Sequence, residues 1–149
     1  MKHPSARWDR TDVWRKVAVV LLMAIAGCAK NENLSEVTGL VTLDGKPLVD
    51  AMIVFSPTVA GTTSYGRTDS EGKYRMQFRD DEYGAWVGEN VVRITTFDLG
   101  TGDHSGKKEQ VPSIYNSKSA TKVTVAAGTN THNFELKSDA GRIVQGPKE

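Results

Sequence analysis

Cys28 is the only cysteine in the 149-residue chain, and it directly follows an uncharged apolar run that begins at Val17. Five basic residues precede this run: Lys2, Arg7, Arg10, Arg15 and Lys16. A polar stretch, residues 29–33, follows the cysteine. A charged segment, a short apolar segment and a small-residue cleavage site form the layout of a secretory signal. This layout therefore predicts an amino-terminal signal peptide that ends at the small residues near Cys28.

Three other interpretations of this segment stay open, of which a buried core helix is disfavoured by basic and polar flanks that lack an amphipathic period. The apolar run from Val17 to Gly27 has 11 residues, which is short of the ~20 that a helix needs to cross a bilayer. This length disfavours a membrane-spanning anchor. The remaining alternative is an ordinary signal peptide in which the cysteine is incidental.

The histidines and acidic clusters of the mature chain do not form a recognisable ligand set. His104 lies beside Asp98 and Asp103, and an imidazole near carboxylates can bind a metal or act as a base. One histidine with one or two acids is too few, so we expect a solvated loop. His132 is expected at an exposed or edge position. Calcium needs six to eight oxygen ligands, so residues 80–82 are expected to form a solvated turn. We predict no catalytic residue, no metal site and no cofactor.

Aromatic side chains offer a different chemistry, because they can stack on a sugar or a peptide. Five could contribute: Tyr65, Tyr74, Tyr83, Trp86 and Tyr115. Tyr74 and Trp86 fall within predicted strands and are expected in the core. Tyr83 and Tyr115 lie in or beside loops, so they are our candidate ligand-binding residues.

Composition limits the class of partner. Removal of residues 1–27 takes away five of the 19 Lys and Arg and two of the 18 Asp and Glu, which leaves 122 residues with 14 basic and 16 acidic side chains and a net charge of −2. No strongly basic face is implied, so nucleic acid is not an expected partner. With Cys28 modified, the folded part would have no thiol for a disulfide or a metal site.

The elements that must position these residues are strands. Apolar patterns predict about seven, within residues 37–43, 51–55, 62–68, 74–78, 86–97, 122–125 and 132–136. Asp44–Gly45 is expected to form a hairpin turn, because both positions can take positive φ. A second turn is expected at Asp69–Gly72. The last two strands are expected to pair with each other.

These patterns predict an all-β sandwich over residues 36–137. A polar tether, residues 28–35, would precede it, and a flexible tail, residues 138–149, would follow it. Residues 98–119 form the longest irregular segment, and loops of that length are usually functional or mobile.

Two resemblances extend this interpretation. Ile25-Ala26-Gly27-Cys28 resembles the lipobox of bacterial lipoproteins, which implies cleavage before Cys28 and attachment of a diacylglycerol to its sulfur. Val37-x-Gly39-x-Val41-x-x-Asp44-Gly45-Lys46-Pro47-Leu48-x-x-Ala51-x-Ile53-x-Phe55 and Thr68-Asp69-Ser70-Glu71-Gly72-Lys73-Tyr74 are similar to carboxypeptidase regulatory-like domains. The later Val111-Pro112-x-x-Tyr115-Asn116 resembles small lipoproteins of the planctomycete type. The resemblance implies a transthyretin-like (prealbumin-like) Greek-key sandwich of about seven strands.

Such domains are mostly accessory modules, and some bind carbohydrate or protein. Hydrolases of 5-hydroxyisourate share the transthyretin-like fold, but this chain lacks their C-terminal Tyr-Arg-Gly-Ser. We therefore expect a non-enzymatic lipoprotein, anchored through Cys28 to the outer face of the cytoplasmic membrane or to the outer membrane. Its partner would be an envelope protein or a glycan. One alternative is a glycan- or peptide-binding module that uses the loop at residues 98–119, and another is a hydrolase of unknown type.

Overall fold

The computed structural model describes residues 32–102 and 104–146 of the chain. The predicted signal peptide, Cys28 and residues 29–31 of the predicted tether lie outside the described residues. Within those residues, fourteen strand segments and one short 3₁₀ helix are present, with no α-helix. The prediction of an all-β fold is confirmed. The segments outnumber the seven predicted strands partly because bends and sheet crossings divide single extended stretches.

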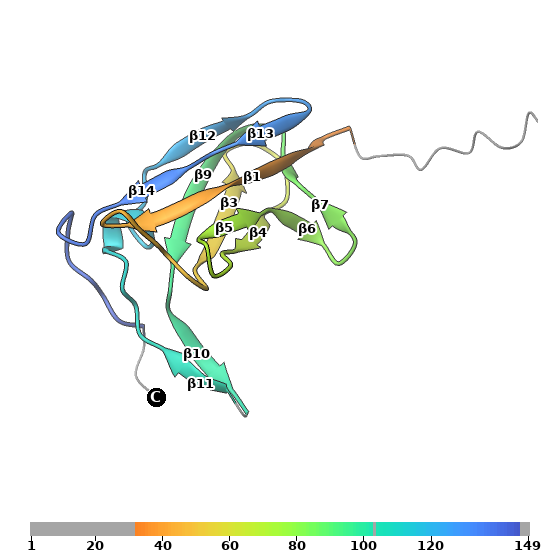
Figure 1. Ribbon diagram of the computed structural model, residues 1–149. Coiled ribbons are helices and arrows are strands. Elements are labelled where there is room, and N and C mark those ends of the chain that lie inside the picture. The colour runs from red at the N-terminus through yellow and green to blue at the C-terminus, as the bar shows by residue number, and fades with distance from the viewer. Residues whose placement is uncertain (1–31, 103, 147–149) are drawn as a thin grey trace, which may run out of the picture. The chain divides into compact units, whose positions relative to one another are not determined.

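The first sheet is built around β1 (Leu34–Leu43), whose period-two sequence buries Val37 and Val41. Two strands pair with β1 in parallel along one edge: β13 (Thr129–Thr131) and β14 (Phe134–Leu136). Three short strands pair with it in antiparallel fashion along the other edge: β8 (Ala85–Trp86), β5 (Lys73–Arg75) and β2 (Lys46–Pro47). One long strand therefore carries this entire sheet (Figure 1).

The second sheet has six antiparallel strands in the order β12–β9–β3–β4–β6–β7. Their bounds are β12 (Lys122–Val125), β9 (Gly88–Thr95), β3 (Met52–Pro57), β4 (Ser64–Arg67), β6 (Gln77–Arg79) and β7 (Glu82–Tyr83). β3 is central and fully buries Ile53 and Phe55. It ends at Pro57, as predicted, because proline cannot donate to a ladder.

The two sheets pack face to face as a sandwich, with β1 lying over β3 and β9 (Figure 1). Inward-facing side chains of both sheets form one core cluster, which includes Val37, Val41, Ile53, Phe55, Tyr74, Met76, Val92 and Ile94. The outer face of the second sheet is left to polar and half-exposed side chains, since successive residues of a strand point to opposite faces.

One extended stretch, residues 73–79, passes from the first sheet to the second. Its first part, β5, pairs with β1, and its second part, β6, pairs with β4. Met76 lies at the crossing: its N–H donates to Val37 O at 2.9 Å, and its O accepts from Gly84 N at 2.8 Å. The predicted alternation holds through the crossing, with Tyr74 and Met76 buried and Arg75 exposed.

The predicted pairing of the last two strands is wrong. β12 pairs with β9 in the second sheet, whereas β14 pairs with β1 in the first. The chain after β12, residues 126–128, therefore crosses to the first sheet, where β13 pairs with β1, instead of closing a hairpin. The alternation of residues marks a strand but does not specify its partner.

Both predicted turns are confirmed. Asp44 and Gly45 have φ values of 52° and 79°, as a two-residue hairpin turn of this kind requires. At the second turn, Asp69 Oδ1 accepts from Glu71 N at 2.8 Å and from Lys73 N at 2.9 Å. Gly72 then takes a φ of 77°.

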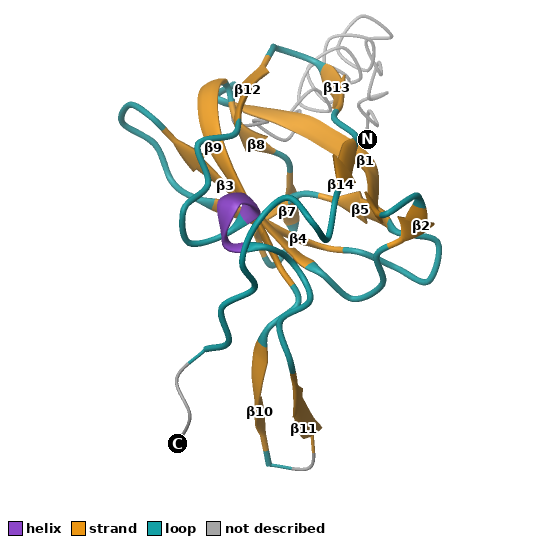
Figure 2. Cartoon of the chain, turned by 90° about the vertical axis from the view of Figure 1, so that its left-hand side faces the viewer, coloured by secondary structure: helices purple, strands orange, loops and turns teal. Residues whose placement is uncertain are grey.

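Residues 98–119 are more ordered than the irregular segment that was predicted. β10 (Asp98–Thr101) and β11 (His104–Lys107) form a hairpin that projects from the sandwich (Figure 2), and η1 (Ser113–Tyr115) follows. The hairpin is solvated on both faces, so its sequence has no apolar alternation by which to recognise it.

Residues 138–146, which were expected to form a flexible tail, hydrogen-bond to this segment. Ser113 N donates to Arg142 O at 2.9 Å. Glu109 N donates to Gln145 Oε1 at 2.9 Å, and Gln145 Nε2 donates to Glu109 O at 3.0 Å.

Candidate functional site

A row of polar and aromatic side chains crosses the outer face of the second sheet. Tyr65 on β4 lies opposite Gln77 on β6, and Gln77 lies opposite Tyr83 on β7. Residues directly opposite each other in antiparallel strands share a face. We call Tyr65, Gln77 and Tyr83 the tyrosine row. Two inter-strand spacings separate the outer two, which is ~9.5 Å.

Both tyrosines of the row are open to solvent. Tyr65 is 52% exposed and Tyr83 is 47% exposed. A tyrosine ring combines a large apolar area with a polar hydroxyl, and such rings are enriched at binding surfaces. The tyrosine row therefore has the composition of a contact surface.

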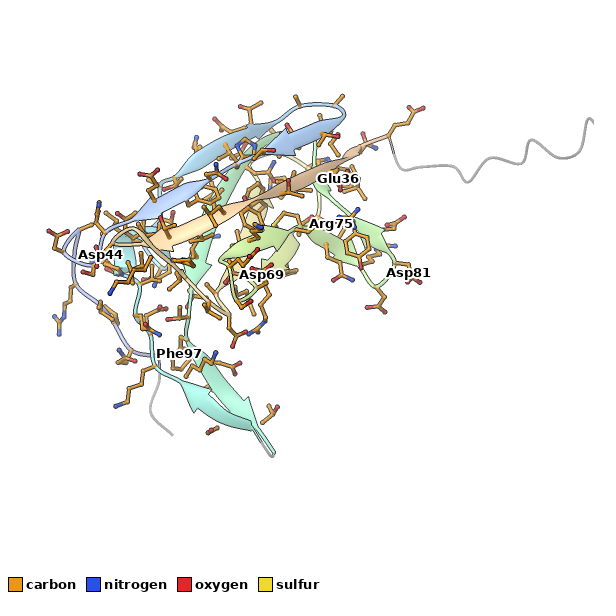
Figure 3. The ribbon with its side chains drawn as sticks, viewed as in Figure 1. Glu36, Asp44, Asp69, Arg75, Asp81 and Phe97 are labelled. Atoms are coloured by element: carbon orange, nitrogen blue, oxygen red, sulfur yellow. The ribbon has the colours of Figure 1, made fainter. Side chains whose placement is uncertain are left out.

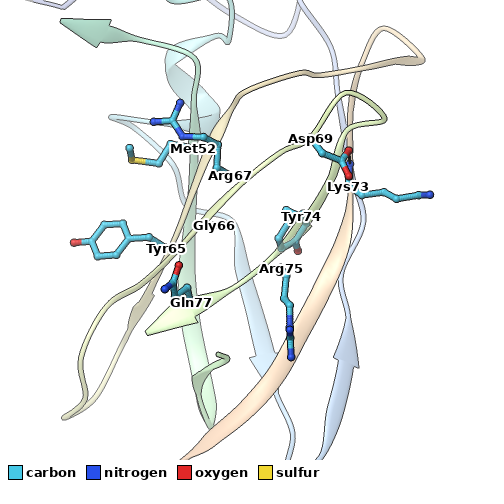
Figure 4. A pocket seen from close by; sticks show the side chains of 9 residues that line it. All are labelled: Met52, Tyr65, Gly66, Arg67, Asp69, Lys73, Tyr74, Arg75 and Gln77. Carbon is cyan, nitrogen blue, oxygen red and sulfur yellow. Dashed lines mark hydrogen bonds between the residues drawn. The ribbon is translucent and has the colours of Figure 1, made fainter. Parts of the chain in front are cut away.

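Two hollows adjoin the tyrosine row, and Tyr65 and Gln77 line both. The larger hollow has a volume of about 550 Å³ (Figure 4). Its lining includes Met52, Tyr65, Arg67, Lys73, Arg75 and Gln77. The smaller hollow has a volume of about 200 Å³, and its lining includes Arg79 and Asp80. A ligand lying along the row could therefore enter a hollow next to the rings.

The larger hollow exists because residues 73–79 change sheets. β4 pairs with β6 only through Tyr65 and Gln77, and β5 is paired with β1. The strands are therefore not joined by a ladder alongside Arg67 and Arg75. Gly66 lets the two backbones approach at the base: a Cβ at this position would lie 2.9 Å from Met76 Sδ and 3.2 Å from Arg75 O.

Cations dominate the lining of the larger hollow. Arg67 Nη1 lies 2.5 Å from Asp50 Oδ1. Arg75 Nη2 lies 3.0 Å from Glu36 Oε1, and both residues of this second pair are labelled in Figure 3. Each of these side chains is between one third and about half exposed. Hydrogen bonds from Lys107 and Arg67 lower the pKa of Asp50, which keeps this carboxylate charged. The arginines are thus held in place by acids at the surface and remain open to solvent.

The two candidate tyrosines from the sequence lie in different places. Tyr83 belongs to the tyrosine row. Tyr115 lies on η1 and lines a separate pocket of about 200 Å³ with Val92, Ile94 and Phe134, which come from both sheets. Its hydroxyl accepts from Lys137 N at 3.3 Å. The structure does not bring Tyr83 and Tyr115 into one site.

Tyr65 was one of the five aromatic residues considered from the sequence but not one of the two chosen candidates, and Gln77 was not considered. Both alternate outward on predicted strands, but their meeting depends on the pairing of β4 with β6.

Tyr74 is buried, as predicted, and its hydroxyl donates to His132 O at 2.7 Å. Burial raises the pKa of Tyr74. Trp86 is half-buried, and its ring centroid lies 6.1 Å from that of Phe78.

The prediction of an exposed or edge position for His132 is wrong in part. Its ring centroid lies 6.1 Å from that of Phe55, and its Nε2 is buried without a hydrogen-bond partner among the described residues.

Residues 80–82 are exposed, as expected for a turn. Across residues 32–102 and 104–146, the structure contains no cluster of histidine, cysteine and acidic side chains that could hold a metal. In the same residues, no helix has the length and apolarity to cross a membrane.

Glu109 is a buried carboxylate that holds residues 109–116 against the end of β9. It is 5% exposed, and it accepts hydrogen bonds from the hydroxyls of Thr95 and Thr96, the backbone N–H groups of Thr96, Gln110 and Val111, and Asn116 Nδ2. Burial alone would raise the pKa of Glu109, but these hydrogen bonds outweigh it and lower the pKa. Both of its carboxylate oxygens accept hydrogen bonds from within the protein, so we assign Glu109 a structural role.

Comparisons of the chain with protein-family models, with curated proteins and with solved structures found no significant match. The class of this domain is therefore described from its fold and its candidate site alone. The described part of the chain is a β-sandwich domain with an aromatic, arginine-flanked outer face.

Proposed function

We propose that this chain is a non-enzymatic, lipid-anchored protein of a bacterial envelope, and that its sandwich binds a glycan or a peptide through the tyrosine row. One observation carries the binding proposal: Tyr65 and Tyr83, each about half exposed, lie in register on one sheet face, and Tyr65 lines two hollows there. Aromatic rings supply contact area, and neighbouring polar groups fix the orientation of a ligand.

Gln77 supplies such a polar group between the two rings. Its Nε2 donates to Asp80 O at 2.8 Å, which holds the amide in one orientation. Its Oε1 has no partner among the described residues, so it is free to accept a hydrogen bond from a ligand hydroxyl or amide. The row therefore combines two rings with one pre-oriented acceptor.

The binding proposal differs from the alternative based on residues 98–119. In that segment the hairpin β10–β11 exposes Leu99, which is 60% accessible, as a large apolar side chain. The tyrosine row instead places aromatic, cationic and amide groups together beside hollows. For this reason we assign the contact to the row, and ligand contact through residues 98–119 stays a prediction.

A direct test uses the full chain extracted in detergent, screened on glycan arrays and against envelope extracts. We expect Tyr65→Ala combined with Tyr83→Ala to lower retention at least tenfold. Leu99→Ala, which removes an equally exposed side chain from the hairpin, serves as the matched control and should leave retention unchanged. Equal retention of the double variant and the native chain would reject the tyrosine row as the contact surface.

The anchor is proposed from the signal layout and from the lipobox-like residues 25–28. Two acyl chains on Cys28 would suffice for stable attachment, because a single chain binds a membrane only reversibly. Cells grown with labelled palmitate should label the native protein and not Cys28→Ala. Mass spectrometry should find Cys28 at the amino end of the mature chain. Equal labelling of both proteins, or a native product that begins at Met1, would reject the anchor and leave the binding proposal to its own test.

A further inference from the structure

The tyrosine row lies on a sheet face and not on a sheet edge. A sheet face presents side chains, whereas the backbone N–H and C=O groups that bind an added peptide strand lie along an edge. The nearby edge strand, β7, has only two residues, Glu82 and Tyr83. A ligand on the row must therefore be recognised by rings and polar side chains. This favours a glycan, since the C–H groups on a sugar ring pack against the π face of an aromatic ring.

The charge around the row is uneven. Three cations line the larger hollow, Arg67, Lys73 and Arg75, against one lining acid, Asp69. Each of the three cations is also paired with an acid outside the lining: Asp50, Glu71 and Glu36 respectively. The Oδ1 of Asp69 already accepts two backbone hydrogen bonds at its turn. In the smaller hollow, Arg79 is balanced by Asp80. The lining of the larger hollow itself therefore carries more cations than acids.

A further cation extends this surface across the sheet. Arg93 on β9 lies opposite Val54, which lies opposite Tyr65. Arg93 is exposed, and no carboxylate of the described residues lies within ion-pair distance of it. The outer face therefore carries arginines on both sides of Tyr65.

The arginines of the larger hollow are suited to carboxylates. The guanidinium group presents a planar fork that matches a carboxylate. Arg67 and Arg75 already hold carboxylates, those of Asp50 and Glu36. Exposed ion pairs of this kind contribute little to stability. A ligand carboxylate can therefore share or displace these acids at small cost.

We infer that the ligand of the tyrosine row is an acidic glycan, a polyuronate, with sugar rings packed on Tyr65 and Tyr83 and a ring carboxylate bound by Arg67 and Arg75 in the larger hollow. This inference rests on the proposed function. It adds the class of ligand and two arginines that determine specificity.

The test measures the affinity of the detergent-solubilised full chain for oligogalacturonate and for its methyl ester, which has the same rings without the charge. We expect the acid form to bind at least tenfold more tightly and to weaken with added salt. Arg67→Gln combined with Arg75→Gln should remove this preference while binding of the methyl ester persists. Arg142→Gln, an exposed arginine outside the outer face, is the matched control and should keep the preference.

Other outcomes overturn the inference and separate it from the proposed function. If the acid and the ester bind equally, and the double variant Tyr65→Ala with Tyr83→Ala loses both, the inference of an acidic ligand is rejected. The proposal of a glycan-binding module is then retained. Binding of dextran sulfate as tightly as oligogalacturonate, weakened equally by Arg142→Gln, indicates unspecific charge attraction and also rejects it. Retention of only neutral glycans or peptides by the tyrosine row rejects it as well. Failure to bind any glycan or peptide rejects both proposals.

Discussion

The guanidinium carbon of Arg75 lies 4.1 Å from the centroid of the Tyr83 ring. Arg75 belongs to β5 in the first sheet, and Tyr83 belongs to β7 at the edge of the second. The same guanidinium reaches Glu36 on β1, so one side chain connects an acid of the first sheet to an aromatic ring of the second. Arg75, which lines the larger hollow, is therefore also in contact with the Tyr83 ring.

The contact between Arg75 and Tyr83 should be measurable as a coupling. Tyr83→Leu should lower the free energy of unfolding by about 0.5–1 kcal/mol, the usual range for an exposed cation–π pair. Tyr83→Phe keeps the ring and should stay near the native value. Urea denaturation of both variants, each with and without Arg75→Gln, gives the coupling energy. A coupling of zero would show that the contact contributes nothing to stability.

The hairpin turn at Asp44–Gly45 allows a test of backbone conformation. Gly45→Val should lower the free energy of unfolding by about 1–2 kcal/mol, the cost of placing a Cβ in the left-handed region. No atom lies within 4 Å of a Cβ built at Gly45, so the cost is conformational and not steric contact with neighbours. Gly45→Asn is the matched control, because asparagine tolerates positive φ, and thermal unfolding compares the two. Equal melting temperatures for the valine and asparagine variants would contradict the turn conformation.

The turn illustrates what the sequence can predict. The conformations of Asp44, Gly45 and Gly72 follow from local preferences, and the structure confirms each. The burial of Val37, Val41 and Tyr74 follows from period-two alternation, which is also local. Strand partners are not local. The alternation of residues 122–125 and 132–136 is the same whether these strands pair together or join different sheets, so their partners could not be inferred.

The candidate site shows the same limit. Tyr83 could be selected because it lies beside a charged turn. Its neighbours in the row could not, because Tyr65 and Gln77 meet only through one pair of residues between β4 and β6. Tyr115 has an equally suggestive place in the sequence, but η1 turns it toward the pocket between the sheets. Assembly of a site on a sheet face depends on register, which is set by the whole fold.

Glu109 should be the most sensitive carboxylate of the described domain. Glu109→Gln replaces one acceptor oxygen by an NH₂ group that faces the existing donors from Thr95, Thr96 or Asn116. We expect a loss of roughly 2–3 kcal/mol in the free energy of unfolding, because hydrogen bonds to a buried charge are the strong ones. Glu135→Gln, at an exposed position on β14, is the matched control and should change little. Urea denaturation at pH 7 makes the comparison, and equal losses in both variants would contradict the assigned role of Glu109.

The lowered pKa of Glu109 should also make the free energy of unfolding depend on pH in the acid range. Hydrogen bonds lower the pKa of Glu109 in the folded state below its ordinary value of 4.5, despite burial. As the pH falls below that value, the unfolded chain binds a proton that the folded chain resists, so the free energy of unfolding decreases. The contribution of Glu109 is therefore complete above about pH 5 and is lost as the pH falls through its folded pKa.

Urea midpoints measured between pH 6 and pH 3 should decline more steeply for the native protein than for Glu109→Gln, whereas Glu135→Gln should follow the native curve. Asp50 and Glu89, whose pKa values are also lowered by their ion pairs, contribute equally to all three proteins. Parallel curves for the native protein and Glu109→Gln would show that Glu109 titrates at the same pH in the folded and unfolded states.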